Sequence, residues 1–435
     1  MMRTEKKLKE VIAYWKGFEI PKMVERDFDI SYLKSDKVLT ITGPRRAGKT
    51  YLCFQMINEL EVPRQNILYL NFEDERLHPI NGDELTKLLD VYREMYEPEE
   101  GRIFLFLDEI HVIPGWERWV RRVTEGEKGV KLVITGSSSE LMPTEFSTEL
   151  RGRAINKTVF PFSFSEFLKA KKVDHGTETA LYGRERPLIK KEFNEYVSLG
   201  GFPEIVSEDE ETLKKEILQG YYSTIFQRDI VERYGINNVQ AMKDFYKIRM
   251  DSFGSKMTFS QSKNNLKSIG HSVSKSTLKR YLSHANDSFL LFDLPRYTEN
   301  TKNRMRYPRK VYPVDTGLVN AVRFNFSEDW GRALETVVFI QLKREKRELF
   351  YYSDRHECDF IVKKENRIIS AIQVTESLEN NREREIKGLM EAMERFDIDE
   401  GLILTQDEDE DIHKEGRKIK VRPLWHWLLT RKNIT

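Results

Sequence analysis

The chain has 435 residues, a third of them charged, and a net charge of only +1. This length exceeds one ordinary hydrophobic core and indicates two or three domains. No apolar run reaches the length of a membrane span and the first residues contain no apolar signal core, so we expect a cytoplasmic protein without a membrane partner. We expect Cys53 and Cys358 to be reduced thiols, and no Cys/His cluster has zinc spacing.

A phosphate-binding pattern follows the first predicted strand, at residues 37–42. The pattern G-x-x-x-x-G-K-[ST] is matched by Gly43, Pro44, Arg45, Arg46, Ala47, Gly48, Lys49 and Thr50. A helix is predicted directly after it, and this context lets backbone N–H groups surround phosphates. We therefore expect ATP here, with Lys49 on the β- and γ-phosphates and the Thr50 hydroxyl on Mg²⁺.

A second apolar strand at 103–107 ends in an acidic pair. Asp108 is placed to hold Mg²⁺ through water, and Glu109 to polarise the attacking water as a general base. The alternative is a pair of acidic residues that caps a helix. Further strands at 66–72, 131–135 and 154–160 alternate with helical stretches, which predicts an α/β, doubly wound parallel sheet.

Two more residues are candidates for contact with the γ-phosphate. Ser137 follows the fourth strand and is the first candidate for a phosphate sensor, with Thr135 second; a serine-rich turn is the alternative. Arg153 is a candidate arginine finger, acting in its own chain or in a neighbouring subunit of a homo-oligomer. An ordinary surface arginine is the alternative.

At this point the sequence resembles the prokaryotic, largely archaeal, predicted AAA-type ATPases that carry a C-terminal domain of unknown function. The matching stretches are residues 43–50, Asp108-Glu109-Ile110-His111, Thr135-Gly136-Ser137-Ser138-Ser139, Leu150-Arg151-Gly152-Arg153, Gly200-Gly201-Phe202-Pro203-Glu204, Gln227-Arg228-Asp229-Ile230 and Tyr312-Pro313-Val314-Asp315-Thr316-Gly317-Leu318. The resemblance implies ATP hydrolysis, an AAA-type core, and a C-terminal half with a winged helix and a nuclease-like fold.

This resemblance and the patterns together predict five segments. They are an N-terminal helical segment at 1–35, the AAA-type core at 36–165, a helical lid or connector at 166–253, a winged helix at 254–314 and a restriction-endonuclease-like domain at 315–435.

A basic island lies between residues 256 and 310. It holds twelve basic and three acidic residues, a net charge of +9, which leaves −8 for the rest of the chain. Such an island is typical of a polyanion partner such as DNA. Two short helices joined by a turn, then two strands around a basic loop, predict a winged helix. The candidate DNA contacts are Lys275, Thr277, Lys279 and Arg280 on the second helix and Arg304, Arg306 and Arg309 in the wing. A packing module or a protein-docking module is the alternative.

The C-terminal region resembles a nuclease fold with altered chemistry. Such nucleases gather a Glu from the first helix, an Asp from a strand start and an E-x-K tripeptide around Mg²⁺. Glu335 and Asp359 match the first two positions, but Gln373 and Thr375 stand where the tripeptide has its acid and its lysine. We expect a degenerate site without DNA cleavage, although Glu357 could partly replace the missing acid of the tripeptide. The acidic run at 407–411 is expected to be a solvated loop.

Three functions are compatible with these patterns. The first is an ATP hydrolase whose nucleotide cycle moves a DNA-binding winged helix. The second is a regulatory ATP switch that docks a protein partner. The third is an ATP-dependent nuclease.

Overall fold

The computed structural model describes residues 2–136, 152–176, 183–304, 306–323 and 330–430. The chain divides into two compact units, Met1–Phe160 and Pro161–Thr435. The finer division into five segments remains a prediction. Among the described residues, no helix is both long enough and apolar enough to cross a membrane.

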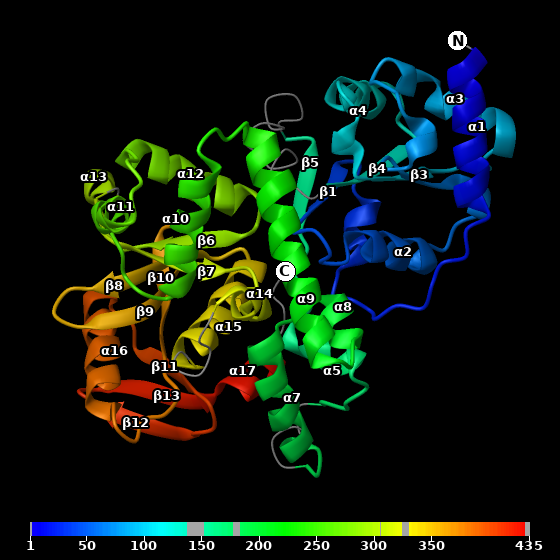
Figure 1. Cartoon of the computed structure of the whole chain (residues 1–435). Coiled ribbons are helices and arrows are strands. Elements are labelled where there is room, and N and C mark those ends of the chain that lie inside the picture. Colours follow the sequence, from blue (N-terminus) through cyan, green and yellow to red (C-terminus); the bar gives the residue numbers. More distant parts are fainter. Residues whose placement is uncertain (1, 137–151, 177–182, 305, 324–329, 431–435) are drawn as a thin grey trace. The chain divides into compact units, whose positions relative to one another are not determined.

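The first unit is built on a parallel sheet of five strands (Figure 1). The strands are β1 (Val38–Thr42), β2 (Ile67–Asn71), β3 (Ile103–Asp108), β4 (Val130–Gly136) and β5 (Ala154–Thr158). Their order in the sheet is β2-β3-β4-β1-β5. Every residue of β1 and β3 is buried, as expected for strands that helices cover on both faces. The α/β class predicted from the sequence is confirmed.

Helices cover both faces of this sheet. The α-helices are α1 (Met2–Lys16), α2 (Lys49–Glu59), α3 (Leu88–Tyr96) and α4 (Trp116–Gly126), and the 3-10 helices are η1 (Ile30–Lys34), η2 (Arg64–Asn66), η3 (Glu75–Leu77), η4 (Glu84–Lys87) and η5 (Ile110–Val112). Leu8 of α1 and Val120 of α4 share one core with Leu105. Leu52 of α2 packs in the opposite core with Phe106, because neighbouring strand residues face opposite sides.

The second unit begins with helices. They are α5 (Phe164–Ala170), α7 (Arg186–Leu199), α8 (Pro203–Ser207), α9 (Glu211–Thr224), the π-helix η7 (Ile225–Glu232) and α10 (Val239–Asp251). The basic island follows as α11 (Phe259–Ser268), α12 (Lys275–Asp287), β6 (Leu291–Pro295), α13 (Thr301–Arg304) and β7 (Arg309–Pro313), and α14 (Thr316–Val322) comes next. β6 and β7 form an antiparallel hairpin, and Met257 adds a bridge to Arg309.

The C-terminal part of this unit contains a mixed sheet of six strands, in the order β12-β13-β11-β10-β9-β8. Its elements are α15 (Trp330–Arg344), β8 (Glu348–Ser353), β9 (Glu357–Lys364), β10 (Arg367–Val374), α16 (Arg382–Phe396), β11 (Glu400–Thr405), β12 (Glu410–Lys414), β13 (Arg417–Pro423) and α17 (Leu424–Thr430). Leu389 of α16 packs in one core with Ile361 and Ile403. The ring of Phe339 on α15 packs beside Phe360 on β9.

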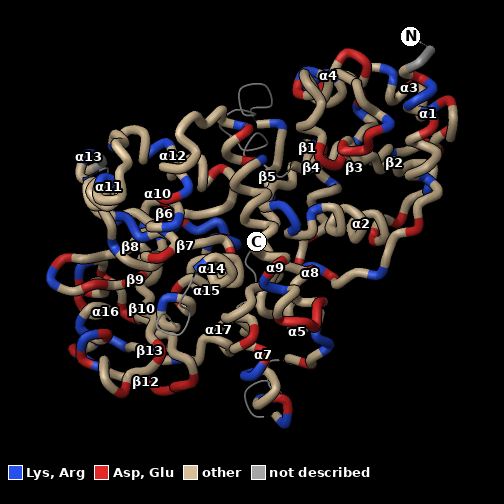
Figure 2. The backbone as a smooth tube through the Cα atoms, in the orientation of Figure 1, with Lys and Arg blue, Asp and Glu red and all other residues tan. Residues whose placement is uncertain are grey.

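The acidic run at 407–411 is a solvated loop only in part. Residues 407–409 lie outside helices and strands, with Asp407 and Asp409 exposed, as predicted. The last two residues begin β12, and Asp411 is paired with Lys418 and Arg422 of β13 at 2.6 and 2.7 Å. Lys190 of α7 reaches Asp407 at 2.5 Å. The run therefore combines an exposed loop and the start of a strand, and ion pairs contact both. In Figure 2, blue segments gather around α11, α12 and the β6–β7 hairpin, whereas both colours mix around β12 and β13.

Candidate functional site

The loop at 43–50 joins the carboxyl end of β1 to α2. Gly43 has φ 151°, and a Cβ atom there would collide with the carbonyl oxygen of Val159. Gly48 has φ 95° and forms the N-cap of α2. The two glycines therefore let the loop turn back against the sheet, which places the start of α2 beside it.

Lys49 lies inside this loop. Its ammonium group is 3.3 Å from the carbonyl oxygens of Gly43 and Pro44 and 3.5 Å from Oε1 of Glu109. Only 5% of the lysine side chain is exposed. Lys49 thus connects the loop to the acidic pair at the end of β3.

Asp108 accepts hydrogen bonds from three hydroxyl groups. Thr50 donates at 2.6 Å and Tyr69 at 2.7 Å to Oδ2, and Thr135 donates to Oδ1. Burial, followed by the charge of Glu109, raises the pKa of Asp108 above its ordinary value of 3.8. The three hydroxyl groups act in the opposite direction, since hydrogen bonds to a carboxylate stabilise its charged form.

Thr135 also contacts the second acidic residue. The backbone N–H of Glu109 donates to its hydroxyl at 3.0 Å, and Glu109 adopts a left-handed conformation with φ 51°. One carboxylate oxygen of Glu109 lies 3.5 Å from Lys49 and the other 3.2 Å from Nδ1 of His111. Thr135 was the second candidate from the sequence, and Ser137, the first, lies outside the described residues.

The residues around Asp108 fit a Mg²⁺ ion. The Thr50 hydroxyl and the Asp108 carboxylate are oxygen donors 2.6 Å apart, at the point where the phosphate loop meets β3. Mg²⁺ prefers oxygen ligands and is usually bound by one or two protein groups together with water and substrate phosphates. Thr50 and Asp108 would therefore hold the ion in the way the sequence predicts.

Arg26 is a supporting residue that sequence reasoning missed. It is buried, and its guanidinium donates to the carbonyl oxygens of Ala47 in the loop, at 2.8 Å, and of Phe160, at 2.7 Å. No motif marks Arg26, because its role follows from contacts that span 134 residues. Of the two arginines in the loop itself, Arg45 lies 3.5 Å from Glu73, and Arg46 is exposed and has φ 66°.

Arg153 lies at the other end of the sheet from the phosphate loop. β5 pairs with β1 in parallel, from Val38 opposite Ala154 to Thr42 opposite Thr158. The loop follows Thr42, whereas Arg153 precedes the first pair, so about 13–16 Å of strand separates them. The Arg153 guanidinium is instead 2.8 Å from Glu125 of α4. The expectation of an arginine finger within the same chain is therefore not met.

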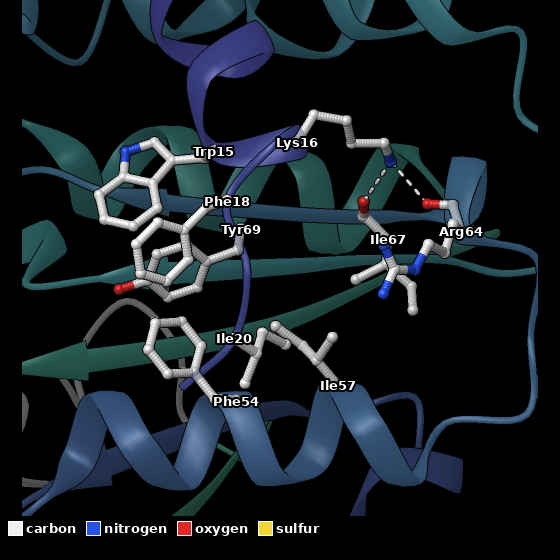
Figure 3. A pocket seen from close by; sticks show the side chains of 9 residues that line it. All are labelled: Trp15, Lys16, Phe18, Ile20, Phe54, Ile57, Arg64, Ile67 and Tyr69. Carbon is white, nitrogen blue, oxygen red and sulfur yellow. Dashed lines mark hydrogen bonds between the residues drawn. The ribbon is translucent and has the colours of Figure 1, made fainter. Parts of the chain in front are cut away.

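A pocket lies beside the same site (Figure 3). Aromatic rings of Trp15, Phe18, Phe54 and Tyr69 form one side of it, and the space measures about 560 Å³ with its open mouth. On the other side, Lys16 donates to the carbonyl oxygens of Arg64 and Ile67; burial, followed by the charge of Arg64, lowers its pKa to about 8. The Tyr69 hydroxyl that reaches Asp108 thus belongs to a side chain that also forms a pocket wall.

The predicted DNA contacts on α12 divide into two groups. Lys275, Lys279 and Arg280 are exposed, while Leu278 and Tyr281 face the interior. The fourth predicted contact, Thr277, is half-buried and bonds through its backbone and side chain to the N-cap Ser274. Thr277 therefore belongs to the helix cap and is not an exposed contact.

Groups of the protein itself contact two of the three predicted wing arginines. Arg309 forms an ion pair with Asp293 across the hairpin. Arg304 donates to the carbonyl oxygen of Thr298 at 3.1 Å and lies 5.0 Å from the ring centroid of Phe350. Of the three predicted arginines only Arg306 is exposed. The wing arginines are therefore not presented together to a phosphate backbone.

The predicted degenerate nuclease residues do converge. Glu335 on α15 and Asp359 on β9 both contact the ammonium group of Lys310, at 3.4 and 2.7 Å. The Oε1 atom of Gln373 accepts the backbone N–H of Asp359 at 3.2 Å, and its amide donates to Glu385 at 2.5 Å. Sequence reasoning missed Lys310 as a member of this cluster and assigned it only to the basic island.

Comparisons with known proteins place these features in a family. A family model described as an AAA domain matches residues 35–168. Models of two domains of unknown function, DUF8612 and DUF4143, match residues 190–329 and 330–427.

Curated relatives and solved structures extend the likeness. The chain is 36% identical over 421 residues to the uncharacterized protein MJ1544 of Methanocaldococcus jannaschii, covering 94% of this chain and 92% of that protein. It is 30% identical over 359 residues to an uncharacterized protein of Haemophilus influenzae, covering 81% and 86%. Among solved structures it is similar to the Walker-type ATPase PABY2304 of Pyrococcus abyssi (TM-score 0.46, 13% identity, 74% of this chain and 95% of that chain). It is also similar to the ORC1 protein of Aeropyrum pernix, solved in complex with DNA (TM-score 0.30, 14% identity, 74% and 91%). The chain therefore belongs to the same family as the uncharacterized proteins of Methanocaldococcus jannaschii and Haemophilus influenzae, and its residues 35–168 match an AAA domain.

Proposed function

We propose that this protein is a Mg²⁺-dependent ATP hydrolase that couples its nucleotide cycle to DNA binding by α12. The proposal of ATP hydrolysis rests on the hydrogen bonds that Asp108 accepts from Thr50 and Thr135. Glu109 is the next residue, and Lys49 lies between Glu109 and the phosphate loop. A phosphate loop, a magnesium ligand and a base candidate meet at one end of the sheet, and phosphoryl transfer depends on such positioning.

Each residue has a distinct role in this proposal. Backbone N–H groups at the start of α2 and the Lys49 ammonium bind the phosphates. Bound Mg²⁺ supplies positive charge that offsets the negative charge of the phosphates. Glu109 accepts a proton from the attacking water, and Thr135 keeps its backbone in place through the Glu109 N–H. Ser137 remains a proposed γ-phosphate sensor, and any contribution of Arg153 comes from a neighbouring subunit of a homo-oligomer.

Two variants separate binding from hydrolysis. We expect Glu109→Gln to bind ATP within a few-fold of the wild type while turnover falls by a factor of at least about 100, because the amide cannot accept the proton. Lys49→Ala should weaken ATP binding itself. Turnover measured by phosphate release, with a fluorescent ATP analogue to measure binding, checks both. Wild-type turnover in Glu109→Gln would remove this residue from the mechanism.

The DNA part rests on the arrangement of α10 to β7. Three helices followed by an antiparallel hairpin, with the Met257–Arg309 bridge beside it, support the assignment of a winged helix. Lys275, Lys279 and Arg280 form an exposed basic surface on α12, whose N-terminal turn carries no acidic residue. Such contacts to phosphates position a protein on DNA and carry little sequence information. The alternative is a protein partner that docks on α12, and ATP turnover measured with and without duplex DNA distinguishes the two.

A further inference from the structure

Lys310 is a buried cation among carboxylates. It lies on β7, its side chain is 3% exposed, and its Nζ atom is 2.7 Å from Asp359 and 2.8 Å from Glu357. Glu335 lies 3.4 Å away. A lysine of the hairpin thus contacts three carboxylates, one from α15 and two from β9.

Further protein groups contact the same carboxylates, and both oxygens of Asp359 and of Glu357 have protein partners. The Tyr312 hydroxyl donates to Glu335 at 2.8 Å, and the backbone N–H of Val374 donates to the second oxygen of Asp359 at 3.1 Å. Lys256 reaches the second oxygen of Glu357 at 2.7 Å. Among the described residues, no group of three or more His, Cys, Asp and Glu side chains is arranged to hold a metal ion. The set therefore does not fit the divalent metal that the nuclease resemblance implies.

Two protein cations face these carboxylates. Lys310 lies within 2.8 Å of Asp359 and Glu357, and Lys256 lies 2.7 Å from Glu357. Burial alone would lower the pKa of Lys310, but the charges of the surrounding carboxylates, Asp359 first, outweigh it and raise the pKa well above its ordinary value. Lysine ammonium groups of the protein therefore supply the positive charge next to Asp359 and Glu357.

We propose that Lys310 is the built-in cation of this cluster: it takes the place that a catalytic metal would need and fastens the β6–β7 hairpin to the C-terminal sheet. Further contacts run along the same junction. Tyr312 stacks on Phe339 of α15 with ring centroids 4.6 Å apart, and the Tyr351 hydroxyl of β8 donates to the carbonyl oxygen of Pro308 at 2.7 Å. The hairpin is therefore part of the C-terminal domain's core and closes the carboxylate cluster to metal ions.

A double-mutant cycle tests the ionic link. Removing Lys310 leaves buried carboxylates uncompensated, so the unfolding equilibrium constant of Lys310→Met should rise by roughly a hundredfold or more in urea titrations. Asp359→Asn should destabilise the wild type but be neutral or stabilising in the Lys310→Met background, because it removes the excess negative charge. The matched control is Lys343→Met on α15, whose lysine lies 5.3 Å from the ring centroid of Phe292, and it should show no such coupling. Additive effects of Lys310→Met and Asp359→Asn would overturn the proposal.

A metal titration needs no variant of Lys310 and covers the case in which Lys310→Met does not fold. Mn²⁺ binding, measured by electron paramagnetic resonance of the free ion, should be the same for the wild type and Asp359→Asn, since Lys310 already occupies the cluster. Any Mn²⁺ bound near Asp108 is common to both proteins. If the wild type binds an additional equivalent of Mn²⁺ that Asp359→Asn does not bind, Lys310 does not take the place of a metal ion.

Discussion

A single hydroxyl group organises the acidic pair of the nucleotide site. Thr135 donates to Asp108 and accepts the backbone N–H of Glu109, so it positions both the proposed magnesium ligand and the proposed base. It is fully buried at the end of β4, next to β3, which explains how a residue 27 positions away reaches Asp108. Positioning residues of this kind contribute through the geometry of the groups that they hold.

Thr135→Val should therefore reduce ATP turnover about tenfold or more, while ATP binding changes little, because valine keeps the shape and loses both hydrogen bonds. Phosphate-release assays at saturating ATP measure this. Thr40→Val is the matched control: this threonine is buried in β1, and its hydroxyl has no hydrogen-bond partner among the described residues. Equal turnover in Thr135→Val and the wild type would show that Thr135 does not position the pair.

The sequence predicts the motif residues of this site but not the residues that support them from elsewhere in the fold. Gly43, Lys49, Asp108 and Glu109 follow from local patterns, because the chemistry of phosphate binding requires those residue types at fixed places beside strands. Arg26 carries no local signal, since the loop carbonyl that it supports is brought near only by the folded sheet.

At the scale of elements, two glycine-containing motifs meet within the second unit. Asp315 caps α14 through the N–H of Leu318 and also accepts the N–H of Gly201 at 2.7 Å. A Cβ atom on Gly200 would collide with the Asp315 carboxylate, and one on Gly317 with the carbonyl oxygen of Leu199. The resemblance includes both motifs, but only the structure shows that they form one joint between α7 and α14.

This joint predicts a pH dependence. Burial raises the pKa of Asp315 from 3.8 to about 6, against the opposing backbone hydrogen bonds. Between these values the folded protein binds more protons than the unfolded chain, so the stabilisation from Asp315 is largest at low pH and is lost as the pH rises through 6. The free energy of unfolding of the wild type relative to Asp315→Asn should fall by about 2 kcal/mol from about pH 4.5 to pH 7.

Urea titrations of the two proteins at matched pH values measure this difference. Asp397→Asn, at a side chain that is 98% exposed, should differ from the wild type by a constant small amount. A pH-independent difference between the wild type and Asp315→Asn would show that the buried carboxyl titrates normally.

The hairpin shows where sequence reasoning about elements fails. The apolar residues of its strands predict their positions correctly. They do not predict the ion pairs of its cations: Arg309 pairs with Asp293 across the hairpin, and Lys310 pairs with carboxylates on α15 and β9. A count of charges along the sequence cannot distinguish a cation that pairs inside the fold from one that faces solvent. The same limit applies to the acidic run at 407–411.

At the scale of the whole molecule, only part of the +9 charge of the basic island is free on the surface. Lys310 and Arg309 are neutralised by carboxylates of the fold, and Lys256 pairs with Glu357. The exposed positive charge is concentrated on α11 and α12 instead, where Lys263 and Lys267 accompany the three basic residues of α12. A DNA surface on these helices remains the proposal, and it is confined to a smaller area than the sequence predicts.

The most direct test of the coupling is ATP turnover with increasing duplex DNA. We expect DNA to raise wild-type turnover several-fold, and we expect this stimulation to weaken steeply with salt because phosphate contacts release counterions. The triple variant Lys275→Ala/Lys279→Ala/Arg280→Ala should abolish the stimulation without lowering basal turnover. The matched control removes three exposed lysines elsewhere, as Lys191→Ala/Lys215→Ala/Lys364→Ala, and should keep the stimulation. Turnover that is the same with and without DNA at low salt, in a wild-type protein that hydrolyses ATP, would contradict the coupling and favour a protein partner on α12.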